Sequence, residues 1–399
     1  MFTTILIFLI ILGVLIFVHE MGHFFTAIRN GVVAHEFGFG FPPRAIGVVK
    51  NENGKWKIIY GNREYYGENT LYSLNIIPLG GFVRIKGENP LHEDDVKDFE
   101  KLSEADKEYV RMSEDPDSFA KQSGWVRFKI LVAGVVMNFV LAWVLISIVL
   151  MFGAPEPNDE LIDPSMIVAN IGVQIVEVES GSPAEEIGLK VGDSVKKVCG
   201  GNSCVDIESA DHLRDTIFAH QGEEIQVDVQ RGKDILTVSG VPRTNVSEGQ
   251  GALGISMMET VLVKYPWYEA LWEGVMRVIN LTAMILIAFG NIIVSLITGQ
   301  GVGAEVAGPV GIAMMTEQMK DLGFVYLLQF AAILSVNLGI INILPIPALD
   351  GGRILFVFIE KIKGSPVNHK VEGMMHTVFF VVLIGFMLFI TVRDVLKLF

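Results

Sequence analysis

A histidine pair stands at the end of an uncharged apolar run near the start of the chain. The run from Met1 to Val18 has no charged side chain, and "HEMGH" follows it with His19, Glu20 and His23. On a helix, residues i and i+4 leave the same face, so both imidazoles can bind one zinc ion. In H-E-x-x-H the glutamate is the base that takes a proton from zinc-bound water. These residues predict metal-assisted hydrolysis.

The membrane setting of this motif bears on its interpretation. A charged residue at the centre of a membrane helix costs roughly 2.5–3.5 kcal/mol. Zinc bound by the two imidazoles, with Glu20 hydrogen-bonded to its water, would offset that cost. The alternative is a histidine pair at a membrane interface without a metal. The position of the motif in a span favours the metal site.

A third zinc ligand must come from another apolar segment. The stretch "NILPIPALDGGR" offers one carboxylate, Asp350, set among Pro345, Pro347, Gly351 and Gly352. Proline and glycine interrupt helices, so the backbone there can turn Asp350 toward the metal. The alternative is an aspartate that ends a helix before a glycine-rich turn.

The composition indicates a polytopic α-helical membrane protein, because 51% of the 399 residues are hydrophobic and 19% are charged. A membrane-spanning helix needs roughly 20 apolar residues. The predicted spans are residues 1–27, 128–154, 322–349 and 374–392. The first is interpreted as a retained span, since it lacks the basic start and the cleavage pattern of a signal peptide. The net charge of -14 and the lack of a basic run exclude a nucleic-acid partner.

A fifth apolar stretch, residues 278–304, bears on the direction in which the following span crosses the membrane. If it crossed the membrane, Asp350 would emerge on the face opposite His23, and one zinc ion could not bind both. We therefore predict four transmembrane helices, with residues 265–320 lying along or dipping into the membrane. The distribution of basic residues places residues 28–127 in the cytosol and the acidic residues 155–273 outside. Residues 350–373 are then expected to form a cytoplasmic loop.

Taken together, "HEMGH" and "NILPIPALDGG" resemble the site-2 protease family of intramembrane zinc metalloproteases. "IPLGGFVRIKG", "AGVVMNF" and "SVNLGIIN" extend the resemblance. It is strongest to bacterial regulators of extracytoplasmic sigma-factor signalling. It implies that His19, His23 and Asp350 bind Zn²⁺ and that Glu20 is the catalytic base. It also implies a multi-pass protein of the bacterial cytoplasmic membrane that cleaves a single-span membrane protein within or near its span.

The resemblance also assigns two asparagines to substrate binding. Asn342, eight residues before the aspartate, is expected to contact the substrate backbone. Asn138 matches the asparagine of a G-P-x-x-N motif, but residues 134–138 read "GVVMN" and lack its proline. For Asn138, packing or an interhelical hydrogen bond remains an equal alternative.

Two regions between the spans are predicted to contain β-structure. In residues 28–127, "AHEFGFGFPP" and "YSLNIIPLGGFVRIKG" predict a small membrane-associated sheet, which by resemblance holds the substrate strand extended. The neighbouring His35 and Glu36 are interpreted as a surface pair, not a second metal site. Residues 167–243 resemble one extracytoplasmic PDZ domain of α+β type, which would bind an extended peptide or a free carboxy terminus. Within it, Cys199 and Cys204 are either bridged or free.

Two other functions compete with proteolysis. A non-catalytic membrane scaffold with a PDZ domain would use the zinc site structurally, but such a site would not need Glu20 as a base. A metal transporter would need further carboxylates along a path through the membrane, and the predicted spans have none beyond those named.

Overall fold

The computed structural model describes residues 2–396, except for 52, 62–64, 66, 68, 89–113, 159–161, 202, 247–250, 300–306, 366 and 368. The chain divides into two compact units. Unit 1 comprises residues 1–143, 277–313 and 331–399, and unit 2 comprises residues 144–276 and 314–330. The proposed metal ligands all belong to unit 1.

Five helices in the described part of the chain are long and apolar enough to cross a membrane, where the sequence predicted four. They are α1 (Phe2–Arg29), α3 (Gly124–Phe152), α6 (Trp267–Thr298), α8 (Phe324–Ile343) and α10 (His369–Leu396). The additional candidate is α6, which qualifies by length and composition. The shorter α7 (Pro309–Leu322) lies between α6 and α8 in the sequence, and a 3₁₀ turn, Phe119–Lys121, precedes α3.

Small residues allow the spans of unit 1 to pack closely. A Cβ atom added to Gly22 on α1 would lie 2.4 Å from the carbonyl oxygen of Ala133 on α3. The hydroxyl of Ser335 on α8 donates a hydrogen bond of 2.8 Å to the carbonyl oxygen of Asn138 on α3. Close approach at small residues and hydrogen bonds between helices are how spans associate in lipid. Together they bring α1, α3 and α8 into one bundle.

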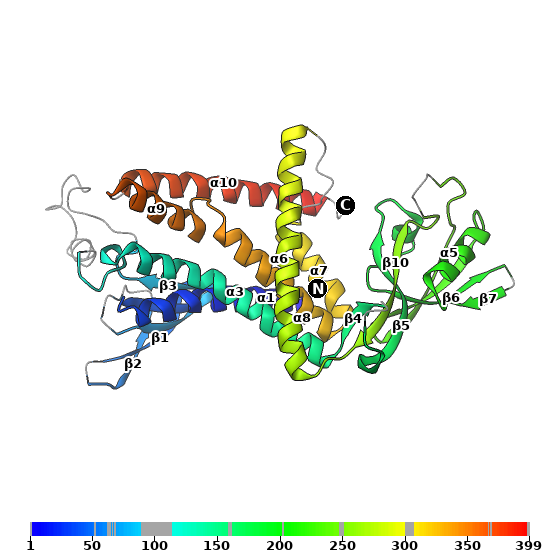
Figure 1. Cartoon of the computed structure of the whole chain (residues 1–399), viewed down its shortest axis with the longest axis horizontal. Coiled ribbons are helices and arrows are strands. Elements are labelled where there is room, and N and C mark those ends of the chain that lie inside the picture. Colours follow the sequence, from blue (N-terminus) through cyan, green and yellow to red (C-terminus); the bar gives the residue numbers. More distant parts are fainter. Residues whose placement is uncertain are drawn as a thin grey trace. The chain divides into compact units, whose positions relative to one another are not determined.

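A three-stranded sheet lies beside α1 in unit 1 (Figure 1). Its order is β2-β1-β3, with bounds Trp56–Tyr60, Ala34–Lys50 and Leu71–Ile85. Both β1 and β3 are long and bent. The two ends of β3 pair with the same part of β1, so that Phe37 has Val83 on one side and Tyr72 on the other. Residues 81–85 therefore pair with β1 on one side and form an edge of the sheet.

The interpretation of His35 and Glu36 as a surface pair was wrong. Both side chains are buried, with 4% and 1% of their surface exposed. Arg44 turns back across the sheet and donates two hydrogen bonds to the carboxylate of Glu36, from Nε at 3.0 Å and from Nη2 at 2.7 Å. Burial of the carboxylate is possible because the bidentate guanidinium compensates its charge.

Unit 2 contains a second sheet with strand order β4-β10-β5-β6-β8-β9, and β7 pairs with β6. The strands are Ala154–Pro157 (β4), Ile167–Val178 (β5), Ser194–Gly200 (β6), Ser203–Asp206 (β7), Ile225–Arg231 (β8), Asp234–Gly240 (β9) and Ile255–Val263 (β10). The helices are α4 (Pro183–Glu186) and α5 (Ala210–Ala219), and a 3₁₀ turn, Pro164–Met166, precedes β5. The predicted range 167–243 thus leaves out β4 and β10. In the structure a disulfide joins Cys199 on β6 to Cys204 on β7.

Residues 350–373, expected as the cytoplasmic loop between two spans, contain a helix. It is α9 (Asp350–Lys363), which ends at Gly364, where the backbone has a φ of 73°. Its exposed apolar residues recur at i, i+3, i+4 and i+7, the spacing of one helical face. They are Leu355, Phe358, Ile359 and Ile362. The sequence prediction named this region only as a cytoplasmic loop and assigned no helix to it.

Candidate metal centre

The two histidines of "HEMGH" point the same way from α1, as their spacing requires. His19 and His23 are each 6% exposed, and their Nε2 atoms lie 3.1 Å apart. The Nδ1 of His23 donates to the carbonyl oxygen of Ile130 on α3 at 2.8 Å. Because that nitrogen carries the proton, the Nε2 of a neutral His23 has a free lone pair directed toward His19. A metal-binding histidine needs this tautomer.

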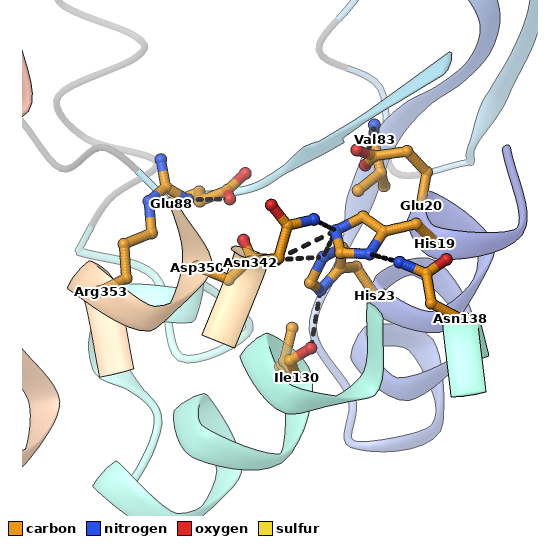
Figure 2. Close-up of polar contacts among 10 residues, drawn as sticks. All are labelled: His19, Glu20, His23, Val83, Glu88, Ile130, Asn138, Asn342, Asp350 and Arg353. Atoms are coloured by element: carbon orange, nitrogen blue, oxygen red, sulfur yellow. Dashed lines mark hydrogen bonds and ion pairs between the residues drawn. The ribbon is translucent and has the colours of Figure 1, made fainter. Parts of the chain in front are cut away.

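Asp350, the first residue of α9, brings its carboxylate to the same point (Figure 2). Its Oδ2 lies 3.0 Å from the Nε2 of His19 and 3.3 Å from the Nε2 of His23. The site thus combines one carboxylate with two imidazoles.

This donor set fits zinc. One ligand atom from each of His19, His23 and Asp350 lies within 4.8 Å of the others. Two imidazoles and one carboxylate are a common protein ligand set of catalytic zinc sites. The Oδ2 of Asp350 is buried and accepts no well-aligned hydrogen bond from the residues that the structure describes, despite the nearby imidazoles. A cation among the three groups would satisfy this oxygen.

Glu20 lies next to this cluster and contacts the edge of the sheet in unit 1. Its Oε2 accepts a hydrogen bond of 3.1 Å from the backbone N–H of Val83 (Figure 2). Val83 belongs to the edge segment 81–85 of β3, so the carboxylate takes the place of a neighbouring strand at that residue. The arrangement puts the Glu20 carboxylate, a strand edge and the three groups of the candidate metal centre within one small region.

The comparisons with known proteins agree with this geometry. The family model described as Peptidase family M50 matches residues 7–61 and 63–386. The chain belongs to peptidase family M50. A relative in Geobacillus kaustophilus, called zinc metalloprotease RasP, is 30% identical over 459 aligned positions, covering 99% of this chain and 98% of that protein. A Bacillus subtilis protein called regulator of sigma-W protease RasP is 29% identical over 463 positions, covering 99% of each chain.

This M50 peptidase is therefore an intramembrane zinc metalloprotease of the site-2 type. Its apolar helices make it a multi-pass protein of the bacterial cytoplasmic membrane, in contact with the lipid bilayer. Zn²⁺ is its cofactor. The non-catalytic scaffold is the less favoured reading.

In this M50 peptidase Asn138 is fully buried on α3 behind the histidines. Its Nδ2 lies 3.1 Å from the Nδ1 of His19, while its Oδ1 has no hydrogen-bond partner among the described residues. The two ends of an amide are assigned from the hydrogen-bond network. With the amide reversed, Oδ1 accepts a hydrogen bond from the Nδ1–H of His19, which leaves the lone pair of Nε2 free for the metal. The sequence left an interhelical hydrogen bond as an equal alternative to substrate contact for Asn138, and the contact with His19 joins α3 to α1 in this way.

Asn342 near the end of α8 lies on the more open side of the cluster. Its side chain is half-buried, and its Nδ2 lies 3.4 Å from the Nε2 of His19. The carboxylate of Asp350 is also partly open on this side, with 19% of its side chain exposed. An amide in this position can reach a group that approaches the metal.

Ala348, two residues before Asp350, has the backbone conformation that L-residues rarely adopt. Its φ is 82°, and its N–H donates a hydrogen bond of 2.8 Å to the Nδ1 of His376 on α10. A non-glycine residue at positive φ costs roughly 1–2 kcal/mol. The hydrogen bond to a separate helix therefore helps to hold the turn that places Asp350 in the cluster. No sequence motif indicates this contact.

Replacing His376 with alanine should speed zinc dissociation by about tenfold, because the turn before Asp350 loses its acceptor. The H376N variant, whose Oδ1 can stand near the position of Nδ1, should recover most of the loss. A348G removes the strain at positive φ and should retain zinc as the wild type does. The readout is transfer of zinc from the purified protein to a chromogenic chelator. Equal rates in H376A and wild type would contradict a positioning role for His376.

Proposed function

We propose that His19, His23 and Asp350 are the zinc ligands of this protease and that Glu20 is its general base. The observation that carries the assignment is the convergence of the three ligand atoms within 4.8 Å, although they come from α1 and from the distant α9. The four residues provide an H-E-x-x-H site with a carboxylate as third ligand. This arrangement leaves one zinc position for water or substrate.

The protein groups divide the chemistry of peptide hydrolysis among them. When bound, zinc polarises the scissile carbonyl and lowers the pKa of water. Glu20 accepts the proton of the attacking water and then passes it to the leaving amine. Asn138 keeps His19 in the tautomer with a free Nε2, and the Ile130 carbonyl does the same for His23. Asn342 donates to the peptide backbone of the substrate.

The proposed substrate is a single-span membrane protein that must unwind locally before it is cut. In a helix the peptide carbonyls are tied into hydrogen bonds, so an attacking water needs an extended segment. The edge segment 81–85 of β3 pairs with β1 on one side only and lies beside Glu20, and an extended peptide can add there as a further strand. The B. subtilis relative is named as a regulator of sigma-W. That name supports a membrane-anchored regulatory protein as substrate.

We infer four complete crossings, although five helices are long enough. The C-terminal half of α1, the start of α3 at Ile130 and the residues after α8 all meet at the metal centre. Thus α3 leaves this side and α8 returns to it, which requires an even number of crossings between them. With 14 residues, α7 is about 21 Å long, too short for a hydrocarbon core of about 30 Å. A complete crossing by α6 alone would make the number odd.

The second sheet, with α5, is proposed to be a PDZ-like domain outside the membrane that controls access. Among the described residues, β4 pairs with residues 260–263 of β10 and Asn158 donates to the Glu259 carbonyl, so no described strand pairs with residues 255–258 of β10 on that side. A peptide or a free carboxy terminus could add to that edge. Peptide binding there would select substrates whose outer portion has already been shortened.

The test is cleavage of a single-span model substrate by the full-length protein in liposomes. Two substrates should be compared, one with an Asn-Pro pair in its span and one with an uninterrupted poly-leucine span. We expect cleavage of the first, loss of cleavage with a zinc chelator and recovery after zinc is restored. Zinc binding without cleavage of any helix-weakened substrate would instead support the membrane scaffold. Equal cleavage of both spans would contradict the requirement for unwinding.

A further inference from the structure

A cavity of about 580 Å³ lies between the N-terminal end of α3 and the second half of α9. The wall from α3 includes Trp125 and Phe128, whose rings stack with centroids 5.4 Å apart. The opposite wall includes Phe358 on α9. Trp125 and Phe358 are 67% and 61% exposed, so large apolar side chains remain open to whatever fills this space.

The rim of the cavity carries positive charge. Arg127 on α3 forms an ion pair with Glu360 on α9, which neutralises the carboxylate at the cavity. The Nε of Arg127 is buried and has no hydrogen-bond acceptor among the described residues. Lys361 also lines the cavity, and no described residue forms an ion pair with it. An acceptor group with negative charge would satisfy both Arg127 and Lys361.

The cavity also lies where a membrane boundary must be. Gly124 begins a helix that is apolar enough to span the bilayer, and its first residues line the cavity. Tryptophan is enriched at such boundaries, and the N-terminus of a helix favours anions. The exposed apolar face of α9, defined above, continues from the cavity along the helix. An amphipathic helix of this kind lies in the plane of the membrane interface.

We propose that this cavity binds an anionic phospholipid of the leaflet at which α1 ends and α3 begins. The phosphate contacts Arg127 and Lys361, and an acyl chain lies along Trp125, Phe128 and Phe358. Charge complementarity selects an anionic lipid over a zwitterionic one. Because α9 begins at the proposed ligand Asp350, the lipid also holds the helix that supports the metal centre against α3.

The experiment uses Trp125 as its probe. The full-length protein in mixed micelles is titrated with dibrominated phosphatidylglycerol or dibrominated phosphatidylcholine, and bromine quenches nearby tryptophan. The difference between wild type and W125F isolates the signal of Trp125 from the other tryptophans. We expect phosphatidylglycerol to quench this signal at about fivefold lower concentration than phosphatidylcholine. This is the gain in affinity that one lysine near an anionic lipid surface provides.

Matched variants on α9 separate this site from a general surface effect. K361E changes a lysine that lines the cavity, and K363E makes the same change two residues later outside it. K361E should remove the preference for phosphatidylglycerol, and K363E should keep it within twofold. Likewise, F358A should weaken quenching by both lipids, whereas I362A should not. Equal quenching of Trp125 by the two lipids, or equal loss in K361E and K363E, would overturn the proposal.

Discussion

Replacing Glu20 with glutamine should lower peptide-bond cleavage by about 10³-fold while the protein keeps its zinc. Loss of a general base costs typically 10²–10⁴ in rate. Glutamine has nearly the same shape, and its Oε1 can still accept the hydrogen bond from the Val83 N–H. Glu20 is outside the group of three ligand atoms, so zinc should remain bound. The measurements are the cleavage rate of the Asn-Pro substrate in liposomes and the zinc content by mass spectrometry.

The matched control for this variant is E186Q, the same substitution at an exposed position on α4. It should cleave at the wild-type rate. If E20Q lost zinc together with activity, Glu20 would act as a ligand or a support of the site. Cleavage by E20Q within tenfold of wild type would rule out Glu20 as the base.

Adding one methyl group at Gly134 should empty the metal site. A Cβ atom there would lie 2.3 Å from the Nε2 of His23 and 2.7 Å from the Cε1 of His19. Contacts below 3.0 Å do not occur between such atoms, so both imidazoles must move in G134A. We expect at least a 100-fold weaker affinity for zinc, and cleavage should fall with zinc occupancy. Equilibrium competition with a fluorescent zinc chelator measures the affinity directly.

The control for G134A is G385A, a glycine on the α10 span where an added Cβ meets nothing within 4 Å. It should bind zinc and cleave as the wild type does. A thermal unfolding curve of G134A without zinc distinguishes a blocked site from a misfolded protein. Stoichiometric zinc with normal affinity in G134A would contradict the packing of α3 against the two histidines.

The parts of the site that follow from local periodicity were predictable from the sequence. The spacing of His19 and His23 places them on one helical face whatever surrounds them, and the Pro- and Gly-rich stretch marks the turn that contains Asp350. The packing of Gly134 against the imidazoles depends on how α1 and α3 cross. The sequence of either helix alone does not predict it. The contact of His376 with the turn is equally non-local, because the sequence between them forms a separate helix.

Errors arose where a local pattern had two interpretations. Adjacent His35 and Glu36 gave no sign of burial, because Arg44 reaches Glu36 through the bend of β1. The apolar residues of α9 have helical spacing in the sequence, at Leu355, Phe358, Ile359 and Ile362. The prediction named the region only as a cytoplasmic loop and did not assign this helix. The helical spacing of these residues predicts an amphipathic helix, because lipid stabilises an apolar helical face at a membrane boundary.

The distribution of the proposed ligands along the chain also has a consequence for biosynthesis. His19 and His23 precede Asp350 in the order of translation, and His376 follows it. A nascent or truncated chain that stops before residue 350 has two imidazoles and lacks the third ligand. On the proposed ligand set, such a chain cannot complete the metal centre, so the segment that contains Asp350 must be made before the site can form.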